Sequence, residues 1–255
     1  MDSNSKASIM LTYAMIDYIC GGYYVLKAIP RPSDLSDILP DKLLTMSDCF
    51  TKVVRDIIQL QWDNYDNVRE AIADEARDFG ISDARIPELT SWAKAQHNTN
   101  YNVYSEIEPA LELRQRFITD HSTHVVGIGL HTSLLDSFQS QLLKDANHGL
   151  GLLELVNEKR PPADGGNVLG FEPLGFDATK FHSWLCHYAP DEAYKRFGIR
   201  PNQLGLIDSL DDAKKVNEYL LQTGAEQAIW EPWLLLDYAP NGSHECLTQT
   251  ADYTD

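Results

Sequence analysis

His124-Val125-Val126-Gly127-Ile128-Gly129-Leu130 is the stretch that decides the fold class. It is a short apolar run that contains three β-branched residues, a composition typical of a buried strand. Helical patterns flank it on both sides. One helix is expected to begin near Ser105, at the capping-box pattern Ser105-Glu106-Ile107-Glu108. The other is expected over Ser133–Lys144, so this part of the chain already mixes strand and helix.

Further strands and helices are interspersed along the rest of the chain. Strands are expected over Tyr23–Ile29, Val168–Phe176 and Ile229–Tyr238. Helices are expected over Ser8–Ile19, which Gly21-Gly22 ends, over Asn64–Phe79, from about Asp191 to Phe197, and after the N-cap pattern at Ser209. Residues 82–99 are polar and are interpreted as irregular. Because no strict βαβ rhythm is present, we predict an α+β fold with a mixed, largely antiparallel sheet packed with helices.

The segment Arg160–Gly166 is the clearest candidate for a linker, because it contains two consecutive prolines and two consecutive glycines. It divides the chain into an N-terminal α+β lobe, residues 1–160, and an aromatic-rich C-terminal α+β lobe, residues 161–240. Residues 241–255 are expected to form a flexible acidic tail. A chain of this length also fits one continuous domain, so both organisations stay open.

The composition excludes several classes of protein. The chain has 255 residues, of which 43% are hydrophobic, so it carries enough apolar surface to fold. The formal net charge is −17, and an acidic surface repels nucleic-acid phosphates and anionic lipid head groups. We therefore expect neither nucleic acid nor membrane as a partner and favour a basic protein.

The cysteines indicate the compartment. Cys20, Cys49, Cys186 and Cys246 are widely spaced, and no Cys-x-x-Cys motif occurs. The first residues show no secretory pattern. We therefore expect a cytoplasmic protein with reduced thiols.

One candidate site for chemistry lies in Phe181-His182-Ser183-Trp184-Leu185-Cys186-His187-Tyr188. In a helix, His182 and Cys186 would share one face and could grip zinc together with His187 or Cys49. The same three residues, His182, Cys186 and His187, are the candidates for a His/Cys-based hydrolase. The alternative, which we favour, is an aromatic core segment without a metal.

Carboxylates form a second candidate site. Glu172, Asp177 and Glu231 lie in apolar strands near aromatic residues, where burial would raise a carboxyl pKa. Nothing in the sequence places the three together, and carboxylates at strand edges or turns explain them equally well.

Aromatic residues are concentrated after residue 170. Eleven of the 25 aromatic residues lie within 170–240, and residues 167–255 also carry a charge of −8. Aromatic rings among carboxylates suit a face that binds a basic protein. The candidate binding residues are Trp184, Trp230, Glu231 and Trp233. The alternative is that these rings form the core of the C-terminal lobe.

The functional hypothesis is an acidic binding protein of the immunity or inhibitor type, which would neutralise a basic partner such as a toxin. The chain contains no Walker A sequence, no Gly-x-Ser-x-Gly and no His-Glu-x-x-His, which favours a non-enzymatic role without a cofactor. The alternatives are a metal-dependent or His/Cys-based hydrolase and a scaffold subunit of a complex. The sequence does not indicate the oligomeric state or the partner's identity.

Overall fold

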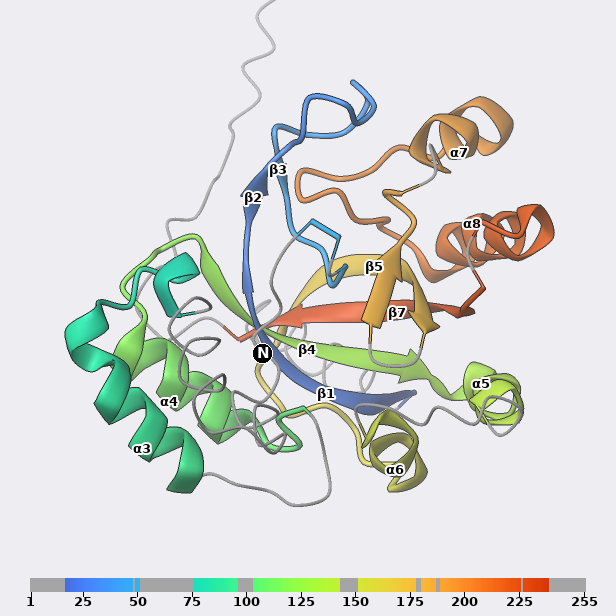
Figure 1. Cartoon of the computed structure of the whole chain (residues 1–255). Helices are drawn as coiled ribbons and strands as arrows, with labels where there is room; N and C mark the ends of the chain where they lie inside the picture. Colours follow the sequence, from blue (N-terminus) through green and yellow to red (C-terminus); the bar gives the residue numbers. More distant parts are fainter. Residues whose placement is uncertain are drawn as a thin grey trace, which may run out of the picture.

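Five antiparallel strands form one sheet in the order β1-β4-β7-β5-β6 (Figure 1). The strands are β1 Tyr18–Lys27, β4 Thr123–His131, β7 Ile229–Asp237, β5 Asn167–Asp177 and β6 Lys180–Ser183. The computed structural model describes residues 17–47, 49–50, 76–95, 103–142, 151–177, 180–186, 189–225 and 227–238. The α+β fold with an antiparallel sheet is confirmed.

The sheet draws its strands from both sides of the expected linker. β1 and β4 precede residue 160, whereas β5, β6 and β7 follow it. β7 lies between β4 and β5 and pairs with both, with Ile128 opposite Leu235 and Leu174 opposite Glu231. The Arg160–Gly166 segment therefore does not separate two sheets, and one sheet contains strands from both sides of it.

Six α-helices lie in the described part of the chain. They are α3 Ile86–Ala95, α4 Ile107–Phe117, α5 Leu135–Leu142, α6 Leu152–Asn157, α7 Ala189–Phe197 and α8 Leu210–Thr223. Short 3-10 turns occupy Asp83–Arg85 and Thr132–Leu134, and a two-stranded sheet pairs β2, Ile29–Pro30, with β3, Lys42–Leu43. None of the helices in these described ranges is long and apolar enough to cross a bilayer.

The expected helices near 105, 133, 191 and 209 are confirmed by α4, α5, α7 and α8. The irregular assignment of residues 82–99 is wrong, because α3 lies within it. Leu89, Trp92 and Ala93 recur at helical spacing, and all three are buried. Only 76–79 of the helix expected over Asn64–Phe79 lies within the described residues, and there the chain is helical from 76 to 78. The tail from residue 241 lies outside them.

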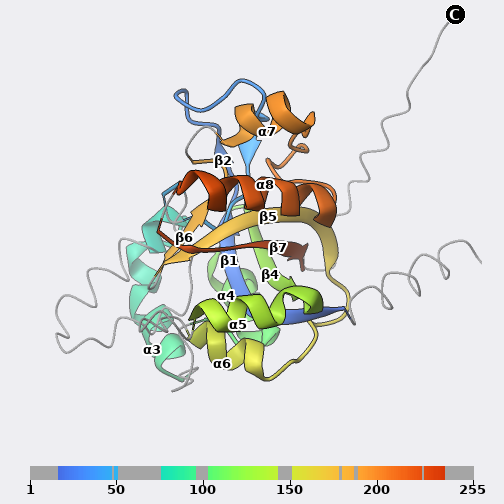
Figure 2. The ribbon, with the colours of Figure 1, turned by 90° about the vertical axis from the view of Figure 1, so that its right-hand side faces the viewer.

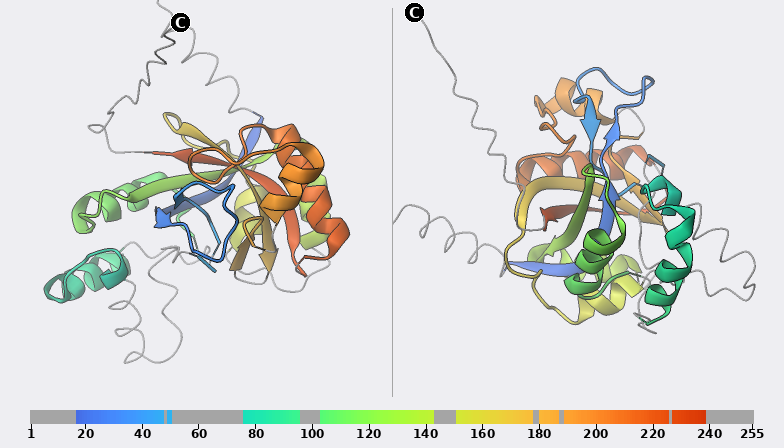
Figure 3. Two further views of the ribbon diagram at one scale, coloured as in Figure 1. Left: turned by 90° about the horizontal axis from the view of Figure 1, so that it is seen from above. Right: turned by 90° about the vertical axis from the view of Figure 1, so that its left-hand side faces the viewer.

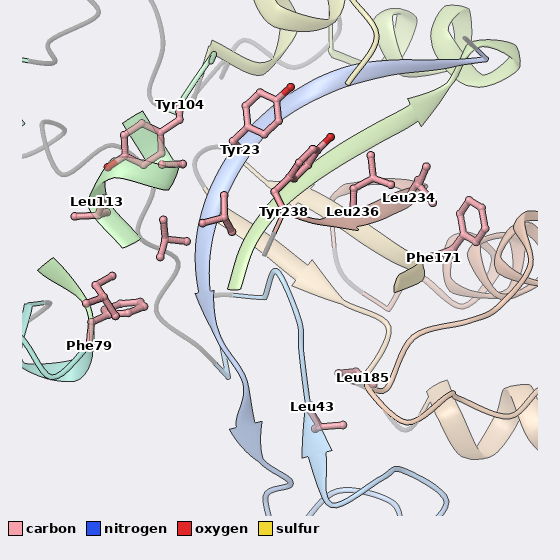
Figure 4. Close-up of a cluster of buried hydrophobic side chains, with 14 of the residues drawn as sticks. Tyr23, Leu43, Phe79, Tyr104, Leu113, Phe171, Leu185, Leu234, Leu236 and Tyr238 are labelled. Carbon is pink, nitrogen blue, oxygen red and sulfur yellow. The ribbon is translucent and has the colours of Figure 1, made fainter. Parts of the chain in front are cut away.

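Each face of the sheet has its own core. One core joins buried residues of α4 and α8 to the sheet. Figure 4 shows Leu113 of α4 in this core, together with Tyr23, Leu234 and Tyr238. The second joins α5 and α6 to the opposite face, where Ile128 and Trp233 lie. Figure 2 shows α8 on one side of the sheet and α5 and α6 on the other. The sheet is therefore the middle layer of three.

The predicted break at Gly21-Gly22 is a β-bulge within β1. Cys20 pairs with Gly129 and Tyr23 with Gly127, so two residues of β1 lie opposite one of β4. Gly22 has a φ of 103°, a conformation that favours glycine. The helix expected over Ser8–Ile19 is wrong at Tyr18 and Ile19, which belong to the strand, and the residues before 17 lie outside the described ranges.

The loop between β2 and β3 lies beside α7 (Figures 1 and 3). Ser36 Oγ in this loop donates a hydrogen bond of 2.6 Å to the Asp191 carboxylate at the start of α7. The contact joins residues that are 155 positions apart in the chain.

The predicted N-cap of α8 at Ser209 can be tested by substitution. The Ser209 hydroxyl accepts a hydrogen bond from the backbone N–H of Asp212 at 3.2 Å. We expect Ser209→Ala to lower the free energy of unfolding by about 1 kcal/mol, because that N–H loses its acceptor. The matched control is Ser82→Ala, since Ser82 precedes a short 3-10 turn and makes no side-chain cap. Chemical denaturation should show no more than about 0.5 kcal/mol for the control; equal losses would contradict the capping role.

Candidate functional site

A fully buried carboxylate, that of Glu172 on β5, is the centre of the candidate site. Its Oε1 accepts hydrogen bonds of 2.5 Å from the hydroxyls of Thr45 and Ser183. Its Oε2 accepts one of 3.0 Å from the backbone N–H of Met46. A buried carboxylate needs such donors to offset the loss of hydration. We call Glu172, Thr45, Met46 and Ser183 the Glu172 cluster.

Backbone groups orient the two hydroxyls of the cluster. Thr45 Oγ1 accepts a hydrogen bond from the N–H of Ser47 at 3.0 Å. Ser183 Oγ accepts one from the N–H of Leu185 at 3.2 Å. Each hydroxyl thus receives a backbone hydrogen and turns its own hydrogen to Glu172. The cluster thereby fixes the segment after β3 against the end of β6.

Burial sets the protonation of Glu172. Loss of water around the carboxylate raises its pKa to about 7, and the three donors oppose this shift. The carboxyl therefore titrates near neutral pH.

Glu231 on β7 is the second buried carboxylate. Burial raises its pKa to about 7, against hydrogen bonds from Ser137 and Gln141 on α5. The Gln141 amide donates at 3.2 Å. Because Glu231 pairs with Leu174, and Leu174 lies two residues from Glu172, both glutamates project from the same face of adjacent strands. The structure thus brings together two of the three carboxylates that the sequence singled out.

Asp177, the third carboxylate, lies at the end of β5 on the opposite face. It accompanies His182, whose Nε2 is 3.9 Å from an Asp177 carboxylate oxygen. His182 pairs with Gly175 in the β5–β6 ladder, so its ring also belongs to the face opposite Glu172. His182 is therefore on a strand, and the helix that would align it with Cys186 is not formed.

Cys186 lies in the turn that follows β6. Its N–H donates to the carbonyl of Ser183 at 3.0 Å. Its thiol contacts the side chains of Ser47 and Cys49, and burial raises the thiol pKa to about 11. Cys186 thus faces the segment after β3, and it does not share one face of a helix with His182. His187 lies outside the described residues.

The four candidate binding residues are all in the interior. Trp184, Trp230, Trp233 and Glu231 are each at most 4% exposed. Trp233 packs edge-on against Phe138 of α5, with ring centroids 5.3 Å apart. The prediction that these side chains form an exposed partner-binding face does not fit this burial. Their apolar rings fill the two cores of the sheet, as the alternative interpretation expected.

Within the described ranges, the exposed aromatic side chains are on α7. Tyr194 and Phe197 are 41% and 43% exposed, and the sequence reasoning did not single them out. The available signal was their position beside Lys195 and Arg196 in a helix whose buried residues are small, namely Ala189, Pro190 and Ala193.

Across the described ranges of the chain, no group of three or more His, Cys, Asp or Glu side chains is placed to hold a metal ion.

Comparison with known proteins finds no protein-family model, no curated protein and no solved structure that matches the chain.

The Glu172 cluster predicts a graded response to substitution. Glu172→Ala leaves three buried donors without an acceptor, and we expect it to lower the free energy of unfolding by about 3–5 kcal/mol. Glu172→Gln should cost less, about 1–2 kcal/mol, because the amide oxygen can accept from Met46 while the NH2 faces the hydroxyl oxygens. Asp177→Ala, at a half-exposed side chain, is the control. Denaturant titration checks the order; equal losses at Glu172→Ala and Asp177→Ala would contradict it.

The raised carboxyl pKa values predict a dependence of stability on pH. A carboxyl whose pKa is higher in the folded state contributes stability that is complete below its ordinary value of 4.5 and is lost as pH rises through about 7. We expect the double variant Glu172→Gln/Glu231→Gln to flatten the fall between pH 5 and 7, by at most about 1.4 kcal/mol per pH unit for each carboxyl removed. Parallel unfolding curves for the two proteins over this range would refute the shifts.

Proposed function

We propose that the chain is an acidic binding protein of the immunity or inhibitor type that neutralises a basic protein partner. The observation that carries this proposal is the formal charge of −17 on 255 residues. Among the described carboxylates, only Glu172 and Glu231 are buried, so the others act from the surface. A field of one sign attracts a partner of the opposite sign and speeds its association.

The surface of α7 and the neighbouring loop supports this proposal with a contact area. We define the α7 surface as Tyr194 and Phe197 together with Asp34 and Asp41 of the β2–β3 loop, all of them exposed. The hydrogen bond from Ser36 to Asp191 holds the loop against α7, one helical turn before Tyr194. Exposed aromatic rings beside carboxylates suit recognition of a basic protein.

The cations on α7 are engaged within the molecule. Glu192 forms ion pairs with Lys195 at 3.3 Å and Arg196 at 2.9 Å. The Arg200 guanidinium lies over the Tyr194 ring, 4.5 Å from its centroid. These positive groups therefore oppose a basic partner less than their number suggests.

An affinity capture from the native host tests the proposal. The tagged chain is used as bait at low and at moderate salt, and bound proteins are identified by mass spectrometry. We expect one stoichiometric basic protein, lost as salt rises because screening weakens the attraction. The absence of any partner at both salt concentrations would overturn the proposal and direct attention to the hydrolase alternative. Recovery of a large complex with several subunits would favour the scaffold alternative.

Variants of the α7 surface then test where the partner binds. Tyr194→Ala/Phe197→Ala should weaken binding of the purified partner at least about tenfold in calorimetric titration, because anchoring rings dominate interface energies. Asp34→Asn/Asp41→Asn should mainly slow association and reduce its salt dependence. The matched control is Leu221→Ala on α8, an apolar side chain that is similarly exposed. If only the control weakened binding, the contact area would be misplaced, although the basic partner would stand.

A further inference from the structure

Two cysteines far apart in the sequence meet beside the Glu172 cluster. Thr45 and Ser183 each hydrogen-bond to the same Glu172 oxygen at 2.5 Å. Cys49 lies four residues beyond Thr45, and Cys186 lies three residues beyond Ser183. The shared carboxylate therefore brings the two cysteine-bearing segments side by side.

The Ser47 side chain hydrogen-bonds to both cysteine residues. The N–H of Cys49 donates to Ser47 Oγ at 3.2 Å, and the Ser47 side chain also hydrogen-bonds to the Cys186 thiol. The Cys49 side chain also interacts with the Cys186 thiol. Cys49 is exposed and Cys186 is half-buried, and both are free. Two neighbouring thiols, one of them open to solvent, can react in turn with a small disulfide.

We propose that Cys49 and Cys186 form a reversible intramolecular disulfide by exchange with a small-molecule disulfide such as oxidised glutathione. The Cys49 thiolate attacks one sulfur of the small disulfide, forms a mixed disulfide and releases one small thiol. The Cys186 thiol then loses its proton, and its sulfur attacks the Cys49 sulfur, closes the protein disulfide and releases the second small thiol. The two protein thiols are oxidised and lose two protons, while the small disulfide is reduced to two thiols.

The disulfide would link the segment after β3 covalently to the turn after β6. These are the two segments that enclose Glu172, so the bond would fasten the cluster from its outer side. It closes a loop of well over 100 residues, and cross-links across long loops restrict the unfolded chain most. The oxidised protein should therefore unfold at a midpoint about 5–10 °C above that of the reduced protein.

Incubation of the full chain with oxidised glutathione, in the presence of a chelator, tests the proposal. We expect wild type to lose two free thiols and to show a mass lower by two hydrogen atoms, with a peptide map that joins Cys49 to Cys186. Dithiothreitol should restore both thiols. Because mapping is done on wild type, the result does not depend on the folding of any variant.

Cysteine variants separate the two steps. Cys186→Ser should retain one glutathionyl group on Cys49, because the resolving thiol is missing, and Cys20→Ser should still form the disulfide. Far-ultraviolet circular dichroism is used to check that each variant is folded. A wild-type map that joins either cysteine only to Cys20 or Cys246, or a wild type that keeps a stable mixed disulfide, would overturn the proposal.

Discussion

The burial of the Glu172 carboxylate is the constraint on which the arrangement of the neighbouring segments depends. Glu172 is buried completely, and a charge in that position is tolerated only where donors replace its water. The donors come from Thr45 and Met46 on one segment and from Ser183 on another. Satisfying this group therefore fixes how two distant segments approach the same strand. The contact between Cys49 and Cys186 follows from that approach.

The sheet imposes the second constraint. β7 is the last described strand, yet it lies between β4 and β5. The early strands and the strands after residue 160 consequently share one hydrogen-bonded sheet, and each of its faces supports a core of its own. The two faces separate the titratable groups as well, with Glu172 and Glu231 on one and Asp177 with His182 on the other.

The burial of the aromatic residues differs from what the binding hypothesis predicted. The tryptophans that the composition made prominent fill the interior, whereas Tyr194 and Phe197 remain open on α7. These exposed rings are the aromatic part of the proposed contact area for a basic protein. The buried Glu172 holds the segment after β3 against the end of β6.

The α+β class and most of the strands and helices could be predicted from the amino-acid sequence alone, because hydrophobic periodicity and helix capping are local properties. The run from His124 to Leu130 and the cap at Ser209 are clear examples. It misassigned α3, whose apolar spacing lies among polar residues, and it took the bulge at Gly21-Gly22 for a helix end. It also singled out Glu172, Glu231 and Cys186, since unusual residue types in apolar runs are visible in one dimension.

Which of these residues meet depends on the tertiary structure. Strand order and register placed Glu172 and Glu231 on one face and Asp177 with His182 on the other. The exposure of a side chain could not be predicted from the sequence either. Whether Trp233 or Tyr194 is covered depends on helices from other parts of the chain. Local sequence patterns determine the secondary structure of each segment. Long-range strand pairing determines which residues lie close together, and a functional site consists of residues that lie close together.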